Sequence, residues 1–172
     1  MRRLLLLAGL AWAAPVRAQP PMPPALIEYG AGLLANLIEA ARGRAIADGV
    51  RPIPTTVYRR LLGFFPAALL QQVRFATGPA ANRISLPSLA FSYGDAAAIT
   101  LREVVLFRDE KAAQSDLKLW AHELTHVLQY QRWGLDGFAS RYVTDRAGVE
   151  KEATDNAERF AKWLGSRQQA DR

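Results

Sequence analysis

The stretch LWAHELTHVLQYQRW, residues 119–133, contains both histidines of a chain of 172 residues. Apolar residues recur through this stretch at helical spacing, which predicts a helix over about residues 115–132. His122 and His126 are four residues apart, or about 40° around the helix axis, so both imidazoles leave the same face. Two imidazoles on one face can bind a single cation.

Glu123 follows the first histidine directly. It lies beside the shared face, where it cannot be a close third ligand but can accept a proton from a water molecule next to the histidines. This H-E-x-x-H spacing is typical of zinc hydrolases, in which the glutamate acts as general base. The alternative is a buried structural pair of histidines, because apolar side chains mark the other side of the helix as buried too: Leu117, Trp120, Leu124, Val127 and Leu128.

A third protein ligand has to be a carboxylate, because the chain has no further histidine and no cysteine. Two candidates, Glu150 and Glu152, lie in a predicted helix over residues 147–166. At about 100° per residue, Glu150 falls on the apolar stripe of this helix, whereas Glu152 points about 200° away, toward solvent. The stripe consists of Ala153, Ala157, Phe160, Ala161 and Leu164.

A carboxylate on a buried stripe has to be paired or to bind a metal, because desolvating it alone is costly. We therefore expect Glu150, rather than Glu152, to complete a Zn²⁺ site with the two histidines. An ion pair between Glu150 and Arg141 or Arg146 is the alternative.

Hydrolysis at such a site needs two further features. The fourth coordination position has to stay open for water, and a hydrogen-bond donor has to stabilise the oxyanion that forms. Tyr142 is the first candidate donor, with Tyr130 and Arg141 as others. The strand region 98–107 could pair with an extended peptide at a sheet edge.

The remaining patterns predict an α+β fold in which a small sheet packs against the histidine helix and the ligand-bearing helix that follows. Helices are expected over residues 25–47, 57–62 and 67–72. Strands are expected over residues 73–76, 84–86, 89–93, 98–102 and 104–107. After the histidine helix, two more helices are expected over residues 137–143 and 147–166, the first of them short.

The N-terminus has the layout of a secretory signal peptide. Arg2 and Arg3 precede the apolar run 4–14, and small residues at the end of the leader predict cleavage near Ala18–Gln19. An uncleaved anchor or a buried helix is the alternative. The expected division of the chain is a signal peptide 1–18, a proline-rich tail 19–24, an N-terminal helical region 25–72, a metallopeptidase core 73–166 and a C-terminal tail 167–172.

Composition limits the partners of the mature protein. Removal of the leader arginines lowers the formal charge from +6 to about +3, and no basic block interleaved with aromatics indicates nucleic-acid binding. The lack of cysteine excludes disulfides, thiolate-bound zinc and a lipoprotein anchor. We expect a periplasmic or secreted protein with a protein or peptide substrate and no stable membrane anchor.

Three stretches, HELTHVLQYQRWG, DGFASRY and VEKEATDNAERFA, resemble the gluzincin branch of zincin metallopeptidases. More narrowly, residues 84–164 are similar to the peptidase domain associated with extracellular contractile injection systems. The resemblance implies a zincin-like fold, a zinc peptidase and Glu150 as third ligand, because Ala153 follows it by three residues. Such proteins often carry an aspartate four residues after the ligand glutamate to orient a ligand histidine, whereas this chain has Thr154 there.

These observations favour an exported zinc peptidase. A zinc-stabilised interaction module with little turnover is the second hypothesis, since Thr154 brings no charge and the chain is small for a deep cleft. A metal-dependent amidase acting on cell-wall peptides is a third.

Overall fold

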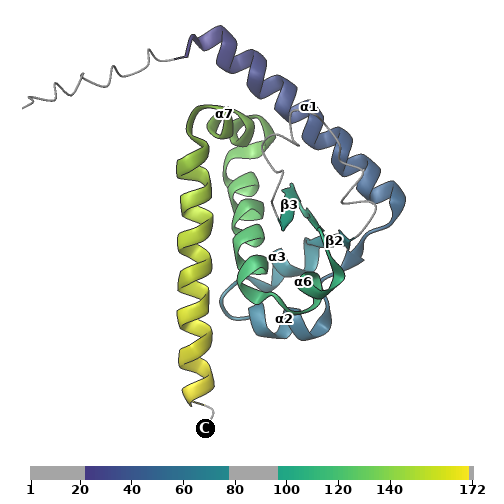
Figure 1. Cartoon of the computed structure of the whole chain (residues 1–172), viewed down its shortest axis with the longest axis vertical. Coiled ribbons are helices and arrows are strands. Elements are labelled where there is room, and N and C mark those ends of the chain that lie inside the picture. Colours follow the sequence, from purple (N-terminus) through teal and green to yellow (C-terminus); the bar gives the residue numbers. More distant parts are fainter. Residues whose placement is uncertain (1–21, 78–96, 171–172) are drawn as a thin grey trace, which may run out of the picture.

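The computed structural model describes residues 22–77 and 97–170. The expected signal peptide 1–18 and the strands expected over 84–86 and 89–93 lie outside the described residues. Helices surround a small sheet, and the last helical segment runs alongside the histidine-bearing one (Figure 1). The predicted α+β class is confirmed.

The sheet of the described residues has four strands in the order β1-β2-β4-β3. They are β1 Arg51–Pro52, β2 Arg74–Thr77, β3 Ala98–Leu101 and β4 Val104–Phe107. β2 and β4 run parallel, and the other two pairs run antiparallel. All four side chains of β4 are buried, as expected for a central strand covered on both faces.

β3 and β4 form a hairpin whose two-residue turn is tied to the long first helix, α1 Pro24–Asp48. Arg102 takes a positive φ of 60° in this turn, a conformation that side chains other than glycine seldom adopt. Its guanidinium donates to Glu39 of α1 over 2.7 Å, and Arg42 of α1 pairs with the neighbouring Glu103. These ion pairs join α1 to the end of the hairpin.

Of the three short helices in the described residues, two lie close to their predicted places and one was not predicted. α2 Thr55–Leu61 and α3 Ala67–Gln72 correspond to the helices expected over 57–62 and 67–72. α6 Glu110–Ser115 was not predicted, although Asp109 caps it by accepting a hydrogen bond from the Ala112 amide over 2.8 Å. β1 was not predicted either; it is two residues long and contains a proline, so the sequence carries little signal for it. Since β1 pairs with β2, region 25–72 is not purely helical.

The last helical element, α7 Leu117–Ala170, is broken at Gly134 and Asp145. We call its parts the histidine segment (117–133), the connecting segment (135–144) and the returning segment (146–170). They correspond to the three helices predicted from the sequence. The returning segment continues through residue 170, beyond the expected end at 166, so most of the predicted C-terminal tail is helical.

The breaks have local causes. Gly134 has a φ of 70°, which glycine tolerates at a helix C-terminus. The side chain of Asp145 accepts a hydrogen bond from the Gly148 amide over 2.9 Å and so caps the returning segment. Together they reverse the chain direction.

The histidine segment is the centre of the core. Trp120 is fully buried and packs against Phe107 and Phe75, with ring centroids 4.6 and 5.7 Å away. Its indole Nε1 donates to the Ala113 carbonyl over 2.8 Å, which joins α6 to α7. Within the described part of the chain, no helix combines the length and apolar character needed to cross a membrane.

Trp120→Ala should lower the free energy of unfolding by about 3–5 kcal/mol, because it leaves a large cavity between sheet and helix. Trp120→Phe should cost less, since only the indole hydrogen bond and part of the volume are lost. Urea unfolding followed by circular dichroism measures both, with Trp163→Phe as the partly exposed control. A Trp120→Ala variant as stable as the control would contradict this packing.

Candidate metal centre

The histidine segment directs both imidazoles to one place. The two Nε2 atoms lie 3.2 Å apart, as the four-residue spacing predicts. The His126 side chain is 8% exposed and that of His122 is 23% exposed. One ring is therefore fixed inside the protein while the other borders solvent.

The returning segment brings the Glu150 carboxylate to the same point. Its Oε2 lies 3.2 Å from Nε2 of His122 and 3.6 Å from Nε2 of His126. This close approach depends on Ala153 and Ala157, which are buried and small and let the two helical segments pack tightly. The alternative was an ion pair of Glu150 with Arg141 or Arg146, but the carboxylate contacts His122, His126 and Tyr142. Those guanidinium groups lie over Trp133 and Tyr142 instead.

The three ligand atoms have the spacing that a zinc ion needs. A tetrahedral cation with bonds of about 2.0–2.1 Å has ligand atoms about 3.3–3.4 Å apart. The observed separations of 3.2, 3.2 and 3.6 Å surround that value. His122, His126 and Glu150 thus fit a divalent cation with nitrogen and oxygen ligands, and they form the group of potential ligands found among the described residues.

Glu123 lies inside the protein, next to the edge of the sheet. It is 4% exposed, and its Oε2 accepts a hydrogen bond from the Thr100 hydroxyl over 2.7 Å. Thr100 belongs to β3, the outermost strand of the sheet within the described residues, so this strand fixes the orientation of the carboxylate. The sequence had indicated Glu123 as a base but gave no sign of Thr100.

The connecting segment closes the site with aromatic side chains. Phe138 stacks on Tyr130 with ring centroids 3.9 Å apart, and its ring meets that of His126 edge-on at 6.1 Å. Tyr142 donates its hydroxyl hydrogen to Oε1 of Glu150 over 2.7 Å. The first candidate for oxyanion stabilisation thus contacts the expected third ligand and leaves Oε2 to face the imidazoles.

Gln129 is the residue of the site that sequence reasoning missed. It is fully buried, and its Oε1 lies 2.8 Å from Nδ1 of His126. Its Nε2 donates to the Val149 carbonyl and to Oε2 of Glu152, both over 3.1 Å. A glutamine three residues after the second histidine was the available signal, because it lies on the same side of the helix as His126, and a polar side chain that is buried there needs partners.

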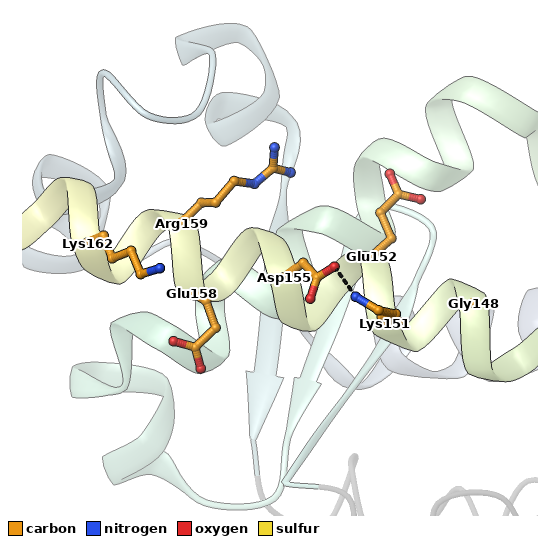
Figure 2. Close-up of a pocket in the computed structure, with 7 residues that line it drawn as sticks. All are labelled: Gly148, Lys151, Glu152, Asp155, Glu158, Arg159 and Lys162. Carbon is orange, nitrogen blue, oxygen red and sulfur yellow. Dashed lines mark hydrogen bonds and ion pairs between the residues drawn. The ribbon is translucent and has the colours of Figure 1, made fainter.

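Glu152 points partly toward solvent, as predicted, but it also makes contacts that the sequence did not predict. Its side chain is 37% exposed and receives hydrogen bonds from Gln129 and from Arg132, the latter over 2.6 Å. Ala153 and Asn156 face the histidine segment, so Glu150 and Glu152 lie on opposite borders of that contact, and both reach across it. In Figure 2 the Glu152 side chain points away from the Lys151–Asp155 ion pair on the same helix.

Figure 2 also shows the residues that line a pocket on the returning segment. The pocket is lined by Gly148 and by six charged residues, Lys151, Glu152, Asp155, Glu158, Arg159 and Lys162. Three of the six are basic and three are acidic, and neither histidine lines the pocket. Thr154 lies on the exposed surface of the same segment. It therefore does not orient either imidazole.

The charges of the site favour a bound cation or proton. Burial alone lowers the pKa of His126, but the hydrogen bond with Glu150 and the charges of Glu123 and Glu150 outweigh it and raise the pKa above 6.5. Burial alone raises the pKa of Glu150, but its hydrogen bonds to His122 and His126 hold the pKa well below 4.5. The carboxylate therefore stays ionised throughout the neutral range.

Glu150→Gln should abolish high-affinity zinc binding, because the neutral amide keeps the shape of the side chain but loses the anionic ligand. Glu158→Gln on the exposed face of the same helix is the matched control. Elemental analysis after zinc loading and dialysis should find about one zinc per chain in the parent and control. Equal zinc contents in all three proteins would remove Glu150 from the site.

Zinc affinity should fall as the pH decreases through the pKa of His126, which lies above 6.5, because the proton and the cation compete for Nε2. Competition with a chromophoric chelator between about pH 5.5 and 8.5 measures this dependence. Glu123→Gln removes a charge that raises this pKa, so its transition should move to lower pH. An affinity independent of pH in this range would contradict binding at His126.

Residues 52–134 match the family model of the eCIS core domain. The matched range contains both histidines and Glu123. It begins earlier than the residue 84 expected from the resemblance and ends before Glu150 and Tyr142. No curated protein and no solved structure matches the chain. The match supports a relationship to the family of domains associated with extracellular contractile injection systems, and residues 52–134 are similar to its core domain.

Proposed function

We propose that the chain is an exported zinc-dependent metallopeptidase that hydrolyses peptide bonds in proteins or peptides. The observation that carries the proposal is the convergence of His122, His126 and Glu150 at the separations of a tetrahedral site, with Glu123 next to the first ligand. Three protein ligands leave one position for water or substrate, which distinguishes a catalytic site from a closed structural one. The export signal 1–18 and the peptide substrate are parts of the same proposal.

Zn²⁺ bound to the three ligands would act as a Lewis acid that makes water nucleophilic near neutral pH. The protein groups supply the remaining requirements. Glu123 accepts a proton from the attacking water and passes it to the leaving amine as the C–N bond breaks. The hydrogen bond from Thr100 holds one carboxylate oxygen of Glu123 and leaves the other for this proton transfer.

The side chains of the site differ in solvent exposure, which supports a catalytic role. His126 and Glu123 are buried, whereas His122 and Glu150 are partly exposed. A substrate carbonyl can therefore approach from the exposed side of His122 and Glu150, while the stacked rings of Phe138 and Tyr142 border His126 and Glu150. The aromatic wall lowers the local dielectric and strengthens the electrostatic interactions at the reacting centre.

A zinc-stabilised interaction module is the second candidate. Its support is the burial of Glu123 and the hydrogen bond from Thr100, since a carboxylate with a purely structural role would have the same environment. Under this hypothesis the cation fastens the returning segment to the histidine segment and no bond is broken.

Glu123→Gln separates the two candidates. For a peptidase, this variant should retain about one zinc per chain and lose hydrolysis by about 10²–10⁴-fold, the usual contribution of a positioned general base. Digestion of a peptide library, followed by mass spectrometry with and without a chelator, measures the activity. The matched control is Glu158→Gln, which changes an equivalent charge far from the triad.

Cleavage of the library by the parent and the control, but not by the variant or the chelated parent, is the expected result. If the parent binds zinc and cleaves nothing, the interaction module is the correct account. Equal cleavage by the variant and the parent would exclude Glu123 as the base.

A further inference from the structure

We infer that Gln129, anchored by Glu152 and the Val149 carbonyl, is a positioning residue that fixes the His126 ring with Nδ1 protonated and directs its Nε2 lone pair at the cation. This inference deepens the proposed function and rests on it. It assigns a role to two residues outside the ligand set. It also explains how the site is organised although Thr154 is exposed.

The first step is the orientation of the Gln129 amide. The group is fully buried and has three polar neighbours. A main-chain carbonyl can only accept a hydrogen bond, and the Glu152 carboxylate, paired with Arg132, is likewise an acceptor. Both therefore face the amide nitrogen, which has two hydrogens to donate. The opposite orientation would place the amide oxygen against two acceptors.

The second step is the tautomer of His126. Because the Gln129 nitrogen is used by the Val149 carbonyl and Glu152, the atom that faces His126 is Oε1, which can only accept. Nδ1 of His126 therefore carries the hydrogen. In the neutral ring the lone pair is then on Nε2, the atom that points at His122 and Glu150. A metal-bound imidazole needs this arrangement.

The third step concerns geometry rather than protonation. Gln129 lies on the histidine segment, while Val149 directly precedes Glu150 on the returning segment. One buried amide thus contacts the backbone beside the third ligand and the ring of the second ligand. A shift of the returning segment would move Glu150 and loosen His126 together. Arg132 extends the same link by holding the other oxygen of Glu152.

Gln129→Met tests the inference by removing both hydrogen-bonding groups at nearly constant volume. Zinc affinity, measured by chelator competition on the full chain, should fall by about 10–100-fold, the usual effect of losing the partner of a ligand histidine. The control is Asn156→Leu, which removes a 2.8 Å hydrogen bond to Thr125 between the same two segments without touching the rings. It should lose stability and keep its zinc affinity.

A second readout separates positioning from packing. The chain has only two histidines, so ¹⁵N spectra of the zinc-loaded protein resolve each ring and report which nitrogen carries hydrogen. The parent should show Nδ1–H for His126, and Gln129→Met should weaken or lose that signature.

A variant of the exposed end of the link avoids the risk of misfolding. Glu152→Ala should reduce zinc affinity, though less than Gln129→Met does, because the amide keeps the Val149 carbonyl as a partner. Asp155→Ala is its control, since the ion pair of Asp155 with Lys151 does not reach Gln129.

The outcomes are distinct. If the parent binds no zinc, the proposed function fails and the inference with it. If the parent binds zinc and both Gln129→Met and Glu152→Ala bind it equally well, the inference alone is overturned. If affinity falls in proportion to stability in Gln129→Met and Asn156→Leu alike, Gln129 is a packing residue.

Discussion

The reversal of α7 is the constraint on which the rest of the structure depends. A helix that continued straight through residues 134 and 145 would carry Glu150 far from the histidines, and no other part of the described chain brings a carboxylate to both rings. Gly134 ends the histidine segment with a positive φ, and Asp145 caps the returning segment. The returning segment can then lie against the histidine segment, where Ala153 and Ala157 allow close packing (Figure 1).

The proposed zinc site and the fold stabilise each other through this contact. An ionised carboxylate beside two imidazoles is costly to bury unless a proton or a cation compensates it. The raised pKa of His126 and the lowered pKa of Glu150 have this physical origin. A divalent cation would satisfy the requirement better, because it would bind all three groups at once. Metal binding at this position would therefore also fasten the last helical segment to the core.

The sequence predicted the parts of the site that depend on spacing within one helix. His122, Glu123 and His126 follow from the helical period alone, and the choice of Glu150 over Glu152 follows from which side of the predicted helix is apolar. The three parts of α7 and the strands 98–102 and 104–107 were also anticipated, because glycine, aspartate and β-branched residues mark them locally.

The sequence could not predict contacts between distant elements. Thr100 reaches Glu123 only because β3 lies at the edge of the described sheet, a consequence of strand order. Gln129 could not be distinguished from the other polar residues of its helix, because its three partners come from two segments. The hydrogen bonds of Glu152 with Gln129 and Arg132 were missed because a single helix was considered by itself. A side chain at the border of a packed face can extend along the neighbouring helix, so its phase does not decide its exposure.

The two glutamates of the returning segment show how one short stretch can supply two different functions. Glu150 and Glu152 are separated by about 200° around the helix, and the contact with the histidine segment falls between them. On one border the Glu150 carboxylate contacts Nε2 of both imidazoles. On the other border the Glu152 carboxylate accepts a hydrogen bond from the Gln129 amide, which faces Nδ1 of His126. The same imidazole is thus approached from its two nitrogens by two carboxylates of one helix, directly by Glu150 and through Gln129 by Glu152. A hydrogen-bond acceptor at Nδ1 makes a ligand imidazole a stronger electron donor at Nε2.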